Sequence, residues 1–476
     1  MITWLSLLYL AALIGMAVYG LLGLVTLLFY WRYRHKAYPA PAVADDHLPS
    51  VTVQLPIYNE RLVLPRLLDA VAQLDYPRNR LQIQVIDDST DETAGLADDL
   101  VRRFQAEGVN MEWVRRENRA GYKAGALAAA LPRASGAFLA IFDADFQPPP
   151  DFLRRTVPHF LDDARLGAVQ ARWGHLNDDA SPLTAAQAIA MDKHFIIEQT
   201  VRHRADLFPK FNGTAGVWRR SCLESCGGWE PDTVCEDLCL STRAVLQGWK
   251  FLFLPDVVAP AELPASINAY KSQQARWAKG STQCLLKYWR LIVTCKDQTV
   301  AARLYALLSM SAYSTHLLLL TLLLLLVPLV ALDFRFSSHW FWIGIAGIGQ
   351  PLLFIMSQEI LYTDWPRRLR HFPTMMLLAM GLAASNCRAI LQALLRRGGP
   401  FVRTPKGDAL NPRLRYRLPA DWIVVVELGL AVYAGIGLIL ALRYANYGPL
   451  LFLTTCGLGF GGVAIGTLWE QRRDEG

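Results

Sequence analysis

The apolar residues of this chain are distributed unevenly, and this distribution limits the fold more than any other feature of the sequence. Residues 2–30 contain no charged side chain, and long apolar runs return after about residue 300. The stretch between them has the mixed composition of a water-soluble domain. With 476 residues, of which 53% are hydrophobic and 19% charged, the chain is too apolar for a disordered protein. We therefore predict a soluble domain anchored to a membrane.

The first apolar run is predicted to cross the membrane as an anchor over residues 1–36. A spanning helix needs about 20 apolar residues, and this run is longer. A cleaved signal peptide would begin with basic residues, whereas here Arg32, Arg34 and Lys36 follow the apolar run. Because basic residues remain on the cytoplasmic side, we expect the amino terminus outside and the next domain in the cytoplasm.

A C-terminal membrane region is predicted over residues 294–476. Its candidate spans lie at about residues 303–332, 339–356, 421–441 and 448–468. The run at 372–394 is ambiguous, because its apolar part ends near Asn386, short of a full span. Basic loops flank this run on both sides, and a crossing would force one of them outside. We therefore prefer an interfacial helix here, which leaves five spans in a multi-pass protein of the cell (inner) membrane.

Residues 49–293 are predicted to form the soluble domain, with an α/β fold. Strand-like apolar runs at 51–55, 81–86, 138–142 and 166–171 alternate with helical patterns at 59–74, 93–107 and 120–131. This alternation favours a largely parallel sheet, in which ligands bind beyond the carboxyl ends of the strands. Carboxylates follow two of these runs, as Asp87-Asp88 and as Asp143-Ala144-Asp145.

The carboxylate pair Asp143 and Asp145 is a candidate metal site. Side chains that flank one residue at a strand end point the same way, and oxygen ligands suit a hard divalent cation. Such a cation would neutralise the diphosphate leaving group of a nucleotide sugar. Asp is also common in turns and helix caps, so Asp143 and Asp145 by themselves, like Asp87-Asp88, have this structural alternative.

Three further constellations each have a functional and a structural interpretation. Lys123, within a glycine-containing turn, is able to contact an anion or to begin a solvated helix. Glu236-Asp237 is a candidate general base or a helix cap. Arg276-Trp277 is a candidate clamp for a diphosphate and a sugar ring, or a membrane-interface pair.

The order and spacing of these motifs resemble those of the processive family-2 glycosyltransferases, which include cellulose, hyaluronan and chitin synthases. The plant cellulose-synthase-like mannan and glucan synthases look most similar. The motifs are VQLPIYNE (53–60), QVIDDSTD (84–91), NRAGYKAGAL (118–127), AIFDADFQP (140–148), FNGTAGVWR (211–219), CEDLCL (235–240) and QQARW (273–277). The resemblance covers essentially all of residues 49–290. It implies the GT-A fold, a Rossmann-like α/β fold, embedded in an α-helical transmembrane protein.

The resemblance also implies roles for individual residues. Asp237 would be the catalytic base, and Asp143 and Asp145 would hold Mg²⁺ or Mn²⁺. The residues implied to bind the donor are Tyr58, Glu60, Asp87, Asp88, Lys123, Asp143 and Arg276. Those implied to bind the acceptor are Asn212, Gly213, Thr214, Glu236 and Trp277. A gating-like loop over 400–408, with Phe401, Thr404 and Lys406, would cover the donor; Cys235 and Arg403 stand where the family often has Thr and Val.

The function implied is an inverting transfer of a hexose from a nucleotide-diphosphate sugar to a growing β-linked polysaccharide, with translocation of the product. The donors considered are UDP-glucose and GDP-mannose, and the products a β-glucan or β-mannan. The main alternative is a glycolipid glycosyltransferase that adds one or a few sugars to a membrane lipid, and a non-enzymatic membrane scaffold is a third. The net charge of +7 is concentrated beside apolar stretches, so we expect the bilayer and no nucleic acid as partner. Sequence does not identify a secretion partner.

Overall fold

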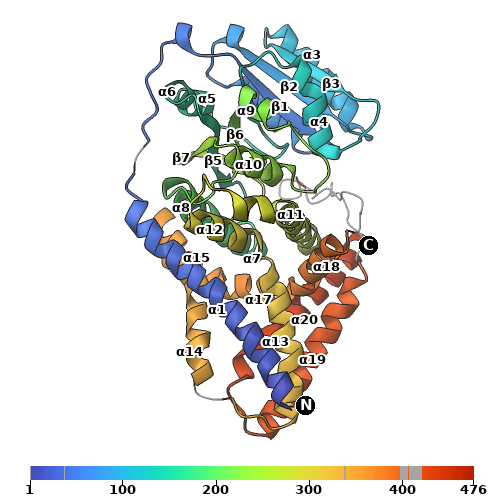
Figure 1. The fold of residues 1–476 in the computed structure, drawn as a ribbon. Coiled ribbons are helices and arrows are strands. Elements are labelled where there is room, and N and C mark those ends of the chain that lie inside the picture. The colour runs from blue at the N-terminus through green and yellow to red at the C-terminus, as the bar shows by residue number, and fades with distance from the viewer. Residues whose placement is uncertain (1, 37, 337–338, 397–405, 407–420, 476) are drawn as a thin grey trace.

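The computed structural model describes residues 2–36, 38–336, 339–396, 406 and 421–475. It has a sheet-containing domain at one end and a bundle of long helices at the other, with α11 and α12 between them (Figure 1). The amino terminus lies at the end of the bundle that is farthest from the sheet (Figure 1). The two compositional regions of the sequence therefore correspond to two regions of the molecule.

The sheet domain contains seven strands in the described part of the chain, in the order β3-β2-β1-β4-β6-β5-β7. Their bounds are β1 Val51–Ile57, β2 Leu81–Asp87, β3 Met111–Arg115, β4 Phe138–Ile141, β5 Leu166–His175, β6 Gly216–Arg219 and β7 Lys250–Ala261. The four predicted strands are confirmed as β1, β2, β4 and β5. The expectation of a largely parallel sheet is confirmed for six of these strands, and β6 is the exception, because it lies between β4 and β5 and runs antiparallel to both.

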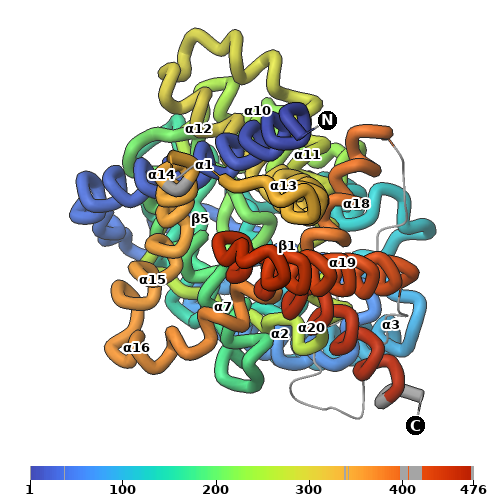
Figure 2. Tube along the Cα trace, turned by 90° about the horizontal axis from the view of Figure 1, so that it is seen from below, coloured from blue at the N-terminus to red at the C-terminus, as the bar shows by residue number. Residues whose placement is uncertain are grey.

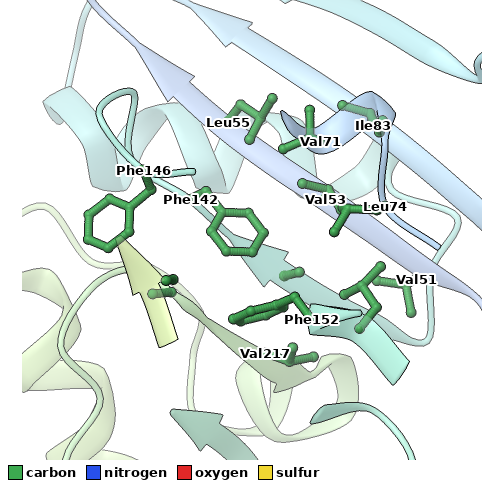
Figure 3. Close-up of a cluster of buried hydrophobic side chains, with 14 of the residues drawn as sticks. Val51, Val53, Leu55, Val71, Leu74, Ile83, Phe142, Phe146, Phe152 and Val217 are labelled. Atoms are coloured by element: carbon green, nitrogen blue, oxygen red, sulfur yellow. The ribbon is translucent and has the colours of Figure 1, made fainter. Parts of the chain in front are cut away.

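The core of this domain follows the period of two that a buried strand requires. Val51, Val53 and Leu55 alternate along β1 and face the same cluster, which also contains Phe142 and Phe152 (Figure 3). All five are at most 1% exposed. Each large side chain contributes about 1.5–3 kcal/mol through burial, so this cluster fixes the position of β1 and β4 and of the loops that follow them.

Of the three helices predicted for this domain, two match the structure, and the third begins later than predicted. Helices α3 Thr93–Ala106 and α4 Tyr122–Ala130 match the predictions. Helix α2 Leu64–Ala72 begins five residues later than predicted, because Asn59 has a φ of +56°, which no right-handed helix accommodates. The other α-helices of the domain and its π-helix are α5 Phe152–Thr156, α6 His159–Asp162, α7 Pro182–Asp192, the π-helix Lys193–Gln199, α8 Thr200–Arg204, α9 Arg220–Ser225, α10 Glu236–Leu246 and α11 Ile267–Thr294.

Five helical segments in the described ranges are long and apolar enough to cross a membrane. They are α1 Ile2–Tyr33, α13 Ser314–Ala331, the segment Trp342–Leu361 (from α14 His339–Ile345 and α15 Gly349–Leu361), α19 Ile423–Arg443 and α20 Leu450–Glu475. Seen from the helical end, α13 lies between α1 and α19 and contacts both (Figure 2). The predicted run 303–332 is interrupted, since α12 Val300–Met310 ends before a turn at Ser311.

The ambiguous run 372–394 forms two helices, α17 Phe372–Gly381 and α18 Ala383–Leu394, preceded by α16 Trp365–Arg368. The segments on either side of Leu382 are bent by 42° relative to each other. Helix α17 packs on α20, where a Cβ atom added to Gly381 would lie 2.4 Å from the carbonyl oxygen of Gly459. Helix α18 packs on α11 and α13. The interfacial placement of this pair remains a prediction.

Candidate active site

The carboxyl ends of three parallel strands form one edge of the site. Ile57 of β1, Asp87 of β2 and Arg115 of β3 are paired in register, so the next residue of each strand leaves the sheet at the same level. Asp88 accepts two hydrogen bonds from Arg116, with 2.8 Å between Oδ1 and Nε. Arg116 also donates to the carbonyl oxygens of Ala120, at 2.8 Å, and Tyr122, at 3.2 Å. Asp88 is therefore held in place by an arginine that the motifs did not indicate.

A cation–aromatic stack lies beside this edge. The Arg119 guanidinium is 3.3 Å from the centroid of the Tyr58 ring and 5.0 Å from that of Tyr122. Gly121, with a φ of +71°, makes the turn between them, and a Cβ atom added there would lie 2.8 Å from Pro231. Planar groups of this kind are able to stack on a nucleobase.

Two of the predicted donor residues form hydrogen bonds within their own part of the domain. The Asp87 side chain is fully buried, and its carboxylate accepts hydrogen bonds from the Ser89 amide, at 2.8 Å, and the Trp113 indole, at 3.3 Å. The carbonyl oxygen of Glu60 accepts from the amides at the start of α2. In this structure Asp87 organises the loop beneath Asp88, and direct contact of Asp87 or Glu60 with a donor remains a prediction.

The two candidate metal ligands follow β4 and contact different lysines. The Asp143 carboxylate accepts a hydrogen bond from Lys123, and the Asp143 amide donates to Thr214 Oγ1 at 2.8 Å. Asp145 forms an ion pair with Lys406, 2.9 Å away. Each carboxylate therefore has a lysine ammonium group as its partner in this structure.

Among the described residues, no three His, Cys, Asp or Glu side chains gather closely enough to hold a metal ion by themselves. The donor set of Asp143 and Asp145 fits a hard divalent cation only if substrate or solvent oxygens supply the remaining ligands. Mg²⁺ is commonly bound in this way, with one or two carboxylates and phosphate oxygens. Of the predicted gating residues, Lys406 reaches Asp145 and the carbonyl oxygen of Glu262, while Phe401 and Thr404 lie outside the described residues.

The candidate base, Asp237, lies in the first turn of α10. Burial raises the pKa of Asp237, and nearby Lys123, Lys210 and Arg276 act against this increase. Burial and the neighbouring Asp237 carboxylate raise the pKa of Glu236 to about 7. A carboxylate with a raised pKa, next to cations that favour its ionised form, is suited to accept a proton near neutral pH.

The loop Asn212-Gly213-Thr214 joins the two sides of the site. The carbonyl oxygen of Gly213 accepts a hydrogen bond of 2.9 Å from Lys123, the same lysine that contacts Asp143. Gly213 has a φ of +83°, and a Cβ atom added there would lie 2.9 Å from Oδ2 of Asp237. Only glycine fits both the backbone angle and this close approach. Asp143, Lys123, Gly213 and Asp237 are thus brought into one cluster.

The helix α11 supplies the last predicted pair, Arg276 and Trp277, which are both partly buried. The positive charge of Arg276 lowers the pKa values of Glu236 and Asp237, so its guanidinium belongs to the same cluster. Gly280 of α11 packs against Cys235, and an added Cβ atom would lie 2.2 Å from the Cys235 sulfur. The close contact places α11 directly beside the start of α10.

A polar network on the π-helix was not predicted. His194 Nδ1 donates to Glu198 at 2.9 Å, and His194 Nε2 accepts from the Asn212 side-chain amide at 2.8 Å. Burial lowers the pKa of His194 to about 4, which is consistent with this neutral tautomer. The Asn212 amide oxygen accepts a hydrogen bond from Gln199. Asn212 was predicted to bind the sugar acceptor, but in this structure its side-chain hydrogen bonds orient its own loop. The i, i+4 spacing of His194 and Glu198 was the only sequence signal for this network.

Comparisons with known proteins identify the family and the fold of this chain. Residues 49–280 match the family described as "Glycosyltransferase like family 2". The chain is 39% identical over 302 residues to glucomannan 4-beta-mannosyltransferase 2 of Arabidopsis thaliana, a match that covers 61% of this chain and 57% of the relative. It is 34% identical over 413 residues to probable glucomannan 4-beta-mannosyltransferase 9 of Oryza sativa subsp. japonica, covering 83% and 77%. A solved mannosyltransferase of Pyrobaculum calidifontis, in complex with GDP-Man and Mn²⁺, has a TM-score of 0.55 at 25% identity and covers 82% of this chain and 100% of that one.

The mixed sheet with carboxylates beyond its strand ends therefore defines a glycosyltransferase of GT-A type. This chain belongs to the family-2 glycosyltransferases, and its relatives include the cellulose-synthase-like glucomannan 4-beta-mannosyltransferases. The resemblance expected from the motifs is confirmed. The matches span 57% and 54% of the length of two of these relatives and 77% of a third.

Proposed function

We propose that this protein is an inverting hexosyltransferase that extends a β-linked mannan or glucomannan from GDP-mannose. The observation that carries the proposal is the cluster of Asp143, Lys123, Gly213 and Asp237, in which one lysine links a candidate metal ligand to the loop that contacts the candidate base. The activities named for the relatives and for the solved mannosyltransferase favour mannose over glucose as the transferred sugar.

In the proposed reaction Asp237 accepts the proton of an acceptor hydroxyl as its oxygen attacks the anomeric carbon. The bond from that carbon to the diphosphate breaks, and GDP leaves with the electron pair from the opposite face. One direct displacement inverts the anomeric centre, so an α-linked donor gives a β-linked product. Lys123 and Arg276 stabilise the charge that grows on the leaving group, where fixed cations are most effective.

The donor is proposed to lie along the edge formed by the strand ends. The stack of Tyr58 and Arg119 would face the base of the nucleotide, and Asp88, held by Arg116, would accept hydrogen bonds from it. Asp143 and Asp145 would hold Mg²⁺ or Mn²⁺ with phosphate oxygens completing the shell, and the ion would supply charge neutralisation of the diphosphate. Trp277 would line the acceptor side, together with the loop that contains Asn212.

The proposed location is a cell membrane, with the sheet domain in the cytoplasm. The end of α1 that is nearer the sheet domain (Figure 1) contains Arg32 and is followed by Arg34 and Lys36, which supports this orientation under the positive-inside rule. The long helices of the bundle would then provide the route by which the polymer leaves the cell. This placement gives the enzyme access to a donor made in the cytoplasm.

The test uses the full chain in detergent or nanodiscs, incubated with labelled GDP-mannose or UDP-glucose and Mg²⁺ or Mn²⁺. We expect incorporation from GDP-mannose into a polymer that an endo-β-mannanase degrades, and loss of incorporation with EDTA. A labelled product that is extracted into chloroform would instead indicate a glycolipid transferase. Absence of transfer from either donor, in a folded preparation, would refute the proposal.

A further inference from the structure

Helix α11, which carries Arg276 and Trp277, is held by acidic side chains of the last two apolar helices. We propose that Glu427 of α19 and Glu470 of α20 position α11, and that the Lys271–Glu427 pair is a positioning pair for the transfer reaction. This inference rests on the proposed function, because its effect is on the rate of sugar transfer. Three sets of contacts carry it.

The first contact is a buried ion pair. Lys271 Nζ lies 2.8 Å from each carboxylate oxygen of Glu427, and the two side chains are 6% and 0% exposed. A charged residue on an apolar helix is costly unless it is paired, and ionisable groups at such positions are commonly functional. Buried ion pairs contribute more to orientation than to stability in several proteins. This pair therefore fixes the rotation of α11 relative to α19.

The second contact is at the start of α11. The Glu470 carboxylate accepts hydrogen bonds from the backbone amides of Ile267, at 2.7 Å, and Asn268, at 3.3 Å. Ser266 caps the same end, accepting from the Ala269 amide at 3.2 Å. A carboxylate at a helix amino terminus satisfies amides that have no partner within the helix and is favoured by the helix dipole. Helix α20 thus fixes the position of the end of α11.

The third set of contacts transmits this placement to the reaction centre. Ala275 and Ala278, four and seven residues after Lys271, lie on the same face of α11 and pack on α18. Beyond them, Gly280 contacts Cys235, and Gln283 accepts a hydrogen bond of 3.1 Å from the Val234 amide. A helix moves as a rigid unit over this length. A change at Lys271 therefore displaces Arg276 and the segment that leads to Asp237.

The experiment measures kcat and the donor KM of the full chain in nanodiscs with GDP-mannose. We expect Lys271→Met to lower kcat about tenfold with a change in KM below about threefold, because the groups proposed to face the nucleotide follow the strands β1, β2 and β3 and do not belong to α11. Lys271→Arg, which retains the ion pair, should keep most of the rate. The reversed pair Lys271→Glu with Glu427→Lys should recover part of what Lys271→Met loses.

Arg335→Met is the matched control. Arg335 donates a hydrogen bond of 2.7 Å to the carbonyl oxygen of Tyr444, which follows the end of α19 that is distant from α11. We expect its kcat to stay within about twofold of the unmodified chain. Equal losses in Lys271→Met and Arg335→Met, or an unchanged kcat in a folded Lys271→Met, would overturn the inference.

If Lys271→Met fails to fold, Glu470→Gln serves instead, since it keeps an acceptor at the start of α11 while removing the charge. We expect a fall in kcat of about threefold for this variant, with an unchanged midpoint of thermal unfolding. An unchanged kcat would refute the positioning role of α20. Absence of transfer by the unmodified chain is a separate result, which contradicts the proposed function itself.

Discussion

The two halves of the candidate site are held together in different ways. On the strand-end half, Tyr58, Asp88 and Asp143 follow neighbouring strands, and the register of the sheet places them along one edge. On the helical half, Asp237 and Arg276 are placed by packing between α10, α11, the loop at Gly213 and the apolar helices. The difference suggests that the strand-end half governs donor binding, whereas the helical half governs the alignment of the reaction.

The largest expected effect comes from removing the base. Asp237→Asn should lower kcat by about 10² to 10⁴, because an amide does not accept the proton of the attacking hydroxyl. Affinity for GDP, measured by calorimetry, should remain within about threefold, since the strand-end half is intact. Glu224→Gln, a similar change on the exposed face of α9, is the control and should have normal activity. Near-normal transfer by Asp237→Asn would remove this residue from the role of base.

The next effect tests the close approach between the two halves. Gly213→Ala should lower kcat about 100-fold, because its Cβ atom would meet the Asp237 carboxylate and its φ of +83° is unfavourable for alanine. Gly95→Ala is the matched control, since a Cβ atom at this position of α3 has no neighbour within 4 Å. It should keep its activity and gain about 0.5–1 kcal/mol in the free energy of unfolding. Equal activities in the two variants would contradict the geometry.

A smaller effect is expected on the strand-end half. Arg116→Met should raise the donor KM about tenfold and change kcat little, because it releases Asp88 and the turn at Ala120 without touching α10 or α11. Arg102→Met removes an exposed ion pair with Asp98 and serves as control, with less than about a twofold change. A fall in kcat at constant KM would contradict the proposal that the strand-end half governs donor binding and the helical half governs the alignment of the reaction.

The smallest effect is a shift in the pH profile. Glu236 has a pKa raised to about 7, and Asp237 also has a raised pKa, so the pair gains protons as the pH falls towards and below 7. Only the ionised base is active, and kcat/KM should therefore decrease as the pH is lowered through this range. Glu236→Gln removes from the pair the carboxyl group whose pKa is raised to about 7, so the acidic limb should move to lower pH and report Asp237, whose pKa is raised mainly by burial. An unmoved limb would show that the two carboxyl groups titrate independently.

The parts of the fold that were predicted correctly have strong local signals. The strands at 51–55 and 81–86 are continuous apolar runs bounded by polar turns, and their register depends mainly on which residues are buried. Strands β3, β7 and β6 were not predicted, and the four residues of β6 lie between a glycine-containing loop and a helix. Its antiparallel direction is a property of the chain path, which local periodicity does not report.

The candidate site was predicted through motifs, but its supporting residues were not. Asp88 was identified because it follows a strand, whereas Arg116, its partner, stands 28 positions away in a segment with no recognisable pattern. His194 and Glu198 orient the loop at Asn212 from a π-helix, a backbone form that has no reliable sequence signal. Such partners depend on distances in the folded chain rather than on neighbours in sequence.

The sequence by itself determined the apolar helices, the strand-end carboxylates and the order of the motifs, because hydrophobic periodicity and strand length act over a few residues. Only the tertiary structure decided that Lys123 meets Gly213, 90 positions later, and that Lys271 meets Glu427, 156 positions later. Contacts at these separations form when packing closes long loops, and the energy that selects them is shared by the whole core. Short sequence motifs therefore identify the reactive residues, whereas the alignment of these residues in the site depends on the packing of the entire molecule.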